Sequence, residues 1–106
     1  MKQLLILPIL LLPFFVENPA YADRGVVVKR YSGCDYFVAD GPRGLYVLEW
    51  YGGYDPYEGD RIVGDIGSYG FENVYYPDRD REGRVYVEDY LESVDGASDE
   101  IRDHCY

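Results

Sequence analysis

The sequence predicts a mainly β fold: a small, partly open antiparallel barrel, SH3-like or OB-like, of about five strands with a short C-terminal helix. Three observations predict it. Short runs rich in β-branched and aromatic residues alternate with corners marked by glycine. Residues 23–106 are enough for one small domain. In the last segment, apolar residues recur at the four-residue spacing of a helix.

Residues 1–22 have the pattern of a cleaved signal peptide. Lys2 gives the positive end, the stretch 4–16 is almost entirely apolar, and Ala-Tyr-Ala at 20–22 is a small-x-small cleavage site. The apolar stretch falls short of the roughly 20 residues that span a bilayer, although a retained anchor is the competing interpretation. The mature chain is then predicted to be a single barrel domain, residues 23–106, in the periplasm or secreted.

Two cysteines remain in that domain, Cys34 near its start and Cys105 near its end. In an exported chain an even number of cysteines indicates a disulfide, and a small core benefits from such a crosslink. We therefore expect a Cys34–Cys105 bond, with two unpaired thiols as the alternative. His104 could activate a free Cys105, but an oxidised Cys105 has no thiol to activate.

The domain is strongly acidic. Removing Lys2 and Glu17 from the totals of 10 basic and 20 acidic side chains leaves 9 and 19, a net charge of −10. Binding to nucleic acid or to anionic membrane surfaces requires a positive field, so neither partner is expected. A basic protein, a cationic peptide or a divalent metal ion fits this charge, although net charge also serves solubility alone. The oligomeric state cannot be predicted from these features.

The first half of the domain contains three candidate strands. The run 23–30 is short and β-branched, and it either pairs with a sheet edge or leads into the domain. Residues 34–39 form a clearer strand, followed by an Asp-Gly-Pro turn. The strand 45–51 is apolar on both faces, which is typical of a barrel stave, and these two strands should form a hairpin.

The second half continues the pattern. Residues 62–66 and 71–76 are predicted strands, and the stretch 59–76 should form the central hairpin. After a charged loop, residues 85–91 alternate as a half-buried strand. The segment 93–105 is the predicted helix, which would begin at Ser93 or Asp95 as N-cap and return Cys105 to Cys34.

Aromatic residues indicate a binding surface. Several of the 13 tyrosines gather around the glycine-rich loop 52–60 or at the next corner. Such rings offer large, rigid contact areas with a polar tip, which suits recognition of a protein or a glycan. The first hypothesis is a non-enzymatic interaction module with this edge as its binding site, although the same rings could simply cover the core. The candidate residues are Trp50, Tyr51, Tyr54, Tyr57 and Tyr69.

A second hypothesis is a calcium-stabilised structural protein. Counting Asp78 as position 1, acids fall at positions 1, 3, 5 and 12, as in a calcium loop: Asp78, Asp80, Glu82 and Asp89. Asp89 is shorter than the usual glutamate, arginines alternate with the acids, and the flanking segments are strands. The alternative is a solvated loop whose charges neutralise one another, and no cofactor is expected.

A third hypothesis is a small glycan hydrolase. Glu49, Asp60 and Asp65 would lie near one another around the central hairpin, and two carboxylates flanking a sugar bond can act as acid and base. In so acidic a chain, some carboxylates will be close by chance. The sequence contains no nucleophile–histidine–acid set, phosphate loop or zinc cluster, so no catalytic residue is assigned and no enzymatic activity is expected.

The patterns W-Y-G-G, G-D-x-I-V-G-D and S-Y-G-F occur in order between Trp50 and Phe71. In this respect the sequence resembles small uncharacterised exported bacterial proteins. The resemblance covers about a quarter of residues 23–106. It implies export and a disulfide-linked domain, and it implies no particular activity.

Overall fold

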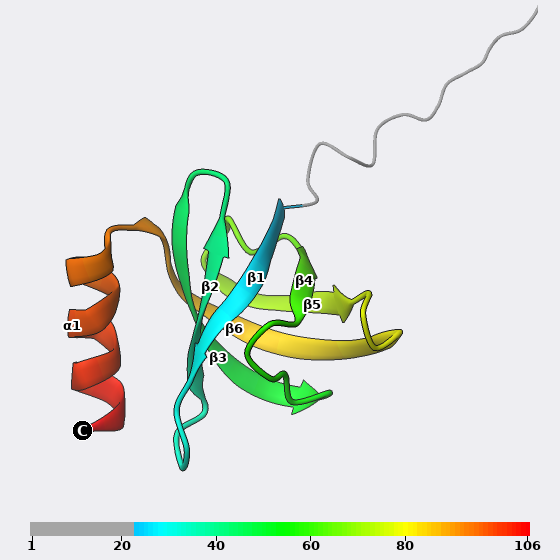
Figure 1. The fold of residues 1–106 in the computed structure, drawn as a ribbon, viewed down its shortest axis with the longest axis horizontal. Helices are drawn as coiled ribbons and strands as arrows, with labels where there is room; N and C mark the ends of the chain where they lie inside the picture. Colours follow the sequence, from blue (N-terminus) through cyan, green and yellow to red (C-terminus); the bar gives the residue numbers. More distant parts are fainter. Residues whose placement is uncertain (1–22) are drawn as a thin grey trace, which may run out of the picture.

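The computed structural model describes residues 23–106, which form a β-barrel with one helix beside it (Figure 1). The predicted signal peptide, residues 1–22, lies outside the described residues. The elements, in chain order, are β1 (Asp23–Arg30), β2 (Tyr36–Gly41), β3 (Gly44–Gly53), β4 (Arg61–Gly64), β5 (Gly70–Tyr76), β6 (Arg81–Glu92) and α1 (Val94–Cys105).

The strands form a closed antiparallel barrel in the order β1-β2-β3-β6-β5-β4. The prediction of a small antiparallel barrel with a C-terminal helix is confirmed, and β1 is the additional strand that closes it. Val26 of β1 pairs with Asp40 of β2 on one side and with Arg61 of β4 on the other. The neighbouring Val27 is buried inside, so the short β-branched run is a full stave and not a lead-in.

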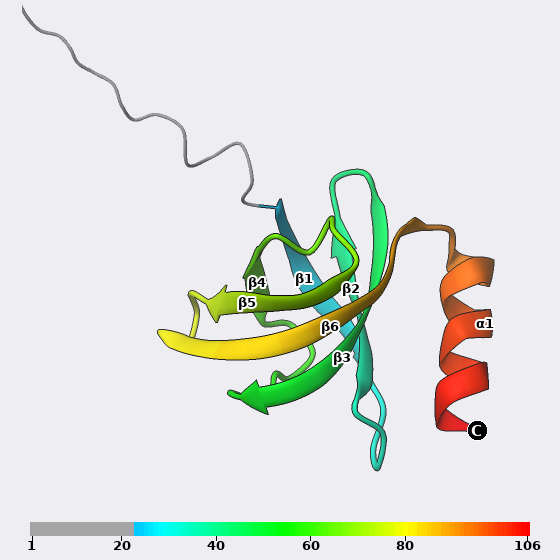
Figure 2. The ribbon, with the colours of Figure 1, turned by 180° about the vertical axis from the view of Figure 1, so that it is seen from behind.

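The β2–β3 hairpin forms as predicted, and its tight turn joins Gly41 to Gly44. β3 continues two residues beyond the expected end because Gly52 and Gly53 pair with β6. A Cβ at Gly53 would lie 2.6 Å from the Glu82 carbonyl oxygen, so only glycine allows this close strand pairing. In Figure 2, β5, β6 and the far part of β3 lie side by side.

The stretch 59–76 forms the predicted hairpin, β4–β5, and because the barrel is closed no hairpin in it is central. β4 ends at Gly64, two residues before the predicted end. The longest strand, β6, pairs with both β3 and β5. β6 already begins at Arg81, so the predicted charged loop is only a tight turn between Tyr76 and Arg81.

Two separate hydrophobic cores stabilise the domain. The barrel interior is filled by aromatic and branched side chains from all six strands and from the turn after β4. A second core lies on the outer side of β2 and β3, where Val38 and Val47 contact Ala97 and Ile101 of α1. Both faces of β3 are apolar because the barrel interior covers one face and α1 covers the other. The interior residues are Val27, Phe37, Ala39, Tyr46, Leu48, Ile62, Ile66, Val74, Tyr76, Val85 and Val87.

The helix α1 is held at both ends. At its start the Ser93 hydroxyl accepts a hydrogen bond from the Gly96 N–H, which confirms Ser93 as the N-cap. At its end Cys105 forms the predicted disulfide with Cys34, and their Cα atoms are 5.6 Å apart. No helix within residues 23–106 is long and apolar enough to cross a bilayer.

Candidate functional site

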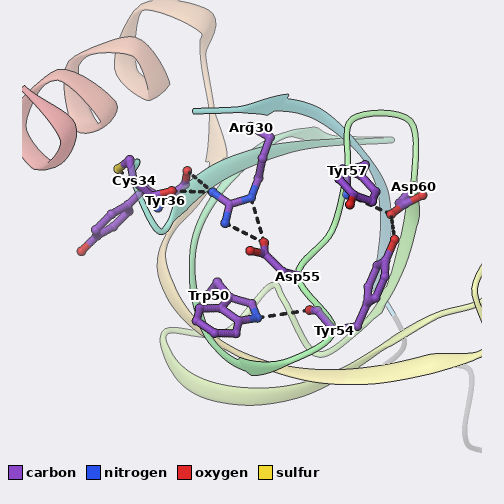
Figure 3. A network of polar contacts seen from close by, with 8 residues as sticks. All are labelled: Arg30, Cys34, Tyr36, Trp50, Tyr54, Asp55, Tyr57 and Asp60. Carbon is purple, nitrogen blue, oxygen red and sulfur yellow. Dashed lines mark hydrogen bonds and ion pairs between the residues drawn. The ribbon is translucent and has the colours of Figure 1, made fainter. Parts of the chain in front are cut away.

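The five aromatic residues of the predicted binding edge do not form one surface. Trp50 and Tyr54 are half-buried and pack against the barrel interior. The Trp50 indole N–H donates to the Tyr54 carbonyl oxygen at 3.2 Å, and the Tyr54 hydroxyl donates to Asp60 Oδ2 at 2.7 Å (Figure 3). Their polar groups are thus hydrogen-bonded within the domain, so these two side chains have a structural role.

Asp60 is the centre of that network and is only 3% exposed. Besides Tyr54, it accepts from the Tyr57 N–H at 2.9 Å and from the Arg79 guanidinium at 3.0 Å. Burial opposes ionisation of Asp60, but these three donors together hold its pKa below the ordinary value. Burial and the bond to Asp60 raise the pKa of Tyr54 to about 12. Asp60 is therefore a buried carboxylate with a structural role.

A second network lies beside the disulfide. The Arg30 guanidinium bridges the carbonyl oxygen of Cys34 and the carboxylate of Asp55, with its N–H 2.6 Å from Asp55 Oδ1 (Figure 3). The segment around these residues lines an open groove of about 450 Å³, and Tyr57 borders it with 65% of its surface exposed. Within this groove the Arg30 guanidinium is already paired with Asp55.

Three aromatic side chains instead meet on the outside of the sheet formed by β3, β6 and β5. Tyr51 of β3, Phe71 of β5 and Tyr86 of β6 form a cluster that we call the outer aromatic face. The Phe71 ring centroid is 4.8 Å from that of Tyr51 and 4.9 Å from that of Tyr86, both edge to face. Tyr51 is 51% exposed and Phe71 is 47% exposed. Strand register creates this cluster, because Phe71 lies directly opposite Tyr86.

Charged residues border the outer aromatic face. The Arg84 guanidinium lies 5.1 Å from the Phe71 ring centroid and donates to the Asn73 side chain. On the other side, Glu49 of β3 pairs with Tyr86 of β6 in the strand register. The helix α1 covers the same outer side of β3 farther back, at Val47. One part of the outer sheet is therefore covered by α1, and another part exposes aromatic rings.

Tyr69 belongs to a separate pair. It precedes β5, is 63% exposed, and its ring centroid lies 4.7 Å from that of Tyr90. The nearby Asp89 carboxylate raises the pKa of the Tyr69 hydroxyl, which donates to it at 3.5 Å. Of the five predicted residues, Tyr51 alone belongs to the outer aromatic face. Phe71 and Tyr86 were not predicted, because only the pairing of three strands brings them together.

The four acids of the proposed calcium loop have different surroundings. Asp78 forms an ion pair with Arg61 at 2.7 Å, and Asp80 accepts from the Tyr75 hydroxyl. Glu82 and Asp89 lie at separate points along the extended β6, since Glu82 pairs with Tyr75 and Asp89 pairs with Val47. The structure therefore does not bring these four carboxylates together around one ion.

The three acids of the hydrolase hypothesis are also in different surroundings. Glu49 lies opposite Tyr36 and Tyr86 on the outer side of the sheet. Asp65 accepts from the Ser68 hydroxyl at 3.1 Å in the turn after β4, whereas Asp60 is buried in its own network. None of the three lines the groove beside the disulfide.

One further group of ionisable side chains lies between α1 and the barrel. The ring of His104 stacks on that of Tyr36, with centroids 4.2 Å apart and planes within 13°. Its Nε2 atom lies 3.4 Å from Glu88 Oε2 and 3.7 Å from Glu100 Oε1. Burial, and then the charges of Asp89 and Glu88, raise the pKa of Glu100. Local sequence does not predict this group, because Glu88 joins it through packing of the helix on the barrel.

Comparisons of the chain with protein-family models, with curated proteins and with solved structures find no match.

Proposed function

We propose that this protein is an exported, non-enzymatic interaction module that binds a protein partner through the outer aromatic face. The observation that carries the proposal is the contact of Tyr51, Phe71 and Tyr86 from three adjacent strands, with about half of Tyr51 and Phe71 left exposed. Aromatic anchors that are already fixed by mutual packing lose little side-chain entropy on binding.

Closure of the barrel determines how a partner can be recognised. A sheet with a free edge can bind an extended peptide through backbone hydrogen bonds. Here each strand has a neighbour on both sides, so the barrel offers no such edge. Recognition must then rely on side chains, and the outer aromatic face exposes large aromatic side chains in contact with one another.

The charges favour a particular kind of partner. With its net charge of −10, the domain attracts basic proteins over long range, and Glu49 borders the face directly. We expect an apolar anchor flanked by lysine or arginine. A glycan is a weaker candidate because sugars stack on open ring faces, whereas here the rings meet edge to face and Arg84 lies against Phe71.

Export is part of the same proposal. A disulfide between Cys34 and Cys105 persists in oxidising compartments, which supports a periplasmic or secreted location. The leader pattern in residues 1–22 would direct the chain there.

The test compares partners recovered with three purified proteins: the natural chain, a Tyr51→Ala/Phe71→Ala double variant and Tyr57→Ala. Tyr57 is a matched control because it is also exposed but lies at the groove, away from the outer aromatic face. We expect the double variant to lose a partner, by at least tenfold in affinity, that Tyr57→Ala retains. Equal recovery by all three would refute the proposal. A ligand that survives proteolysis and is removed by glycosidases would identify a glycan instead.

A further inference from the structure

We infer that Glu88, Glu100 and His104 form a binding site for a divalent transition-metal ion, with Zn²⁺ as the preferred cation. Within residues 23–106, this is the group whose potential ligand atoms, one from each residue, all lie within 4.8 Å of one another. One imidazole nitrogen and two carboxylate oxygens suit zinc, whereas calcium and magnesium prefer oxygen ligands alone.

The distances fit a shared ion better than direct hydrogen bonds. Two ligand atoms on one tetrahedral zinc, each about 2.0–2.1 Å from the metal, are about 3.4 Å apart. His104 Nε2 lies 3.4 Å from Glu88 Oε2 and 3.7 Å from Glu100 Oε1. A direct N–H···O hydrogen bond is usually about 2.7–3.2 Å long. The nitrogen is thus close to both carboxylates without being well placed to hydrogen-bond to either one.

Three different contacts fix the site in advance. Glu100 and His104 are one helical turn apart on α1, so they present their side chains on the same side of the helix. The Tyr36 ring, stacked on His104, holds the imidazole in its orientation. Glu88 comes from β6, and the disulfide at Cys105 holds the end of α1 against the barrel. Such an arrangement reduces the ordering that metal binding would otherwise require.

The charge around the group remains uncompensated by arginine. The arginine ion pairs within the described chain are formed with other acids, and neither Glu88 nor Glu100 has an arginine or lysine within 4.0 Å. A divalent cation would neutralise both carboxylates at once and link α1 to β6. Solvent, or a side chain of a partner, would complete the coordination of the ion.

Calorimetric titration of ZnCl₂ into the untagged, disulfide-bonded protein tests the inference. We expect one zinc per chain and a melting temperature that rises with zinc concentration, by mass action. His104→Gln and Glu88→Gln should each weaken zinc binding at least tenfold. Asp95→Asn is the control, because it removes one carboxylate charge from the first turn of α1, away from the group, and it should leave the zinc affinity within twofold.

Three results would overturn the inference. They are no zinc binding at 1 mM metal, equal zinc affinity in the natural chain and both ligand variants, or calcium binding as tight as zinc. Glu100→Gln is the replacement if one ligand variant fails to fold, as judged by circular dichroism and the absence of free thiols. If the group is instead only an ion pair between a protonated His104 and the two glutamates, no zinc binding is expected.

Discussion

Replacement of Asp60 should produce the largest loss of stability of any single charged residue in the described domain. Its carboxylate is 3% exposed and accepts hydrogen bonds from Tyr54, Tyr57 and Arg79. In Asp60→Ala all three donors lose their acceptor. Hydrogen bonds to a charged group contribute about 1.5–3 kcal/mol each. The Arg79 side chain is 46% exposed and can regain water, so the bonds from Tyr54 and Tyr57 determine the loss, and we expect about 4 kcal/mol.

The Asp60→Asn substitution removes the negative charge but keeps a side chain of nearly the same size and shape. The amide oxygen can still accept from Tyr54 and from the Tyr57 N–H, which both donate to the same carboxylate oxygen, Oδ2. The amide nitrogen then faces the Arg79 guanidinium, a contact between two donors. We therefore expect a smaller loss of about 2 kcal/mol, since two bonds remain but without charge assistance.

Urea unfolding followed by the fluorescence of Trp50, the single tryptophan, measures both changes. Asp103→Asn, on the exposed side of α1, is the control and should change stability by less than about 0.5 kcal/mol. Because the folded-state pKa of Asp60 lies below its ordinary value, its contribution is complete above about pH 4. The stability difference between the natural chain and Asp60→Asn should shrink as the pH falls through that lower pKa. A loss of stability below about 1 kcal/mol in Asp60→Ala would refute the structural role of the Asp60 network.

Two further predictions concern the crosslink and the core. The Cys34→Ser/Cys105→Ser double variant opens a loop with a sequence separation of 71 residues, and it should lose about 4 kcal/mol in urea unfolding. If the double variant were as stable as the oxidised chain, the predicted stabilisation by the Cys34–Cys105 disulfide would be wrong. The Tyr76 hydroxyl is buried with no hydrogen-bond partner, so Tyr76→Phe should stabilise the domain by about 1 kcal/mol. A Tyr76→Phe variant that unfolds at lower urea would mean that this hydroxyl has a partner.

Local sequence patterns were sufficient to predict the positions of most of the strands. The two apolar faces of residues 45–51 predicted a barrel stave, and α1 covers the outer side of this strand at Val47. The spacing of Ala97 and Ile101 predicted the helix and its apolar face, but not that this face packs on the outer side of β2 and β3. The role of β1 could not be predicted, because barrel closure depends on its pairing with β4, more than 30 residues away along the chain.

The candidate site was predicted only in part, for the same physical reason. Proximity in sequence grouped Trp50 with Tyr51, but alternation along β3 directs one ring inward and the other outward. Phe71 joins Tyr51 only through the pairing of β5 and β3 with β6. His104 meets Glu88 only through the docking of α1, which the disulfide fixes. The outer aromatic face and the group around His104 are therefore both created by contacts between segments that are far apart in the sequence.

The most direct test of the central claim is site-specific photo-crosslinking in cells that produce the protein. A photoreactive phenylalanine derivative would replace either Phe71, on the outer aromatic face, or Tyr57, which is also exposed but lies at the groove. We predict that illumination yields an adduct with a second, different polypeptide from position 71 and none from position 57. Adducts from position 57 alone, or none from position 71, would contradict the assignment of the binding surface.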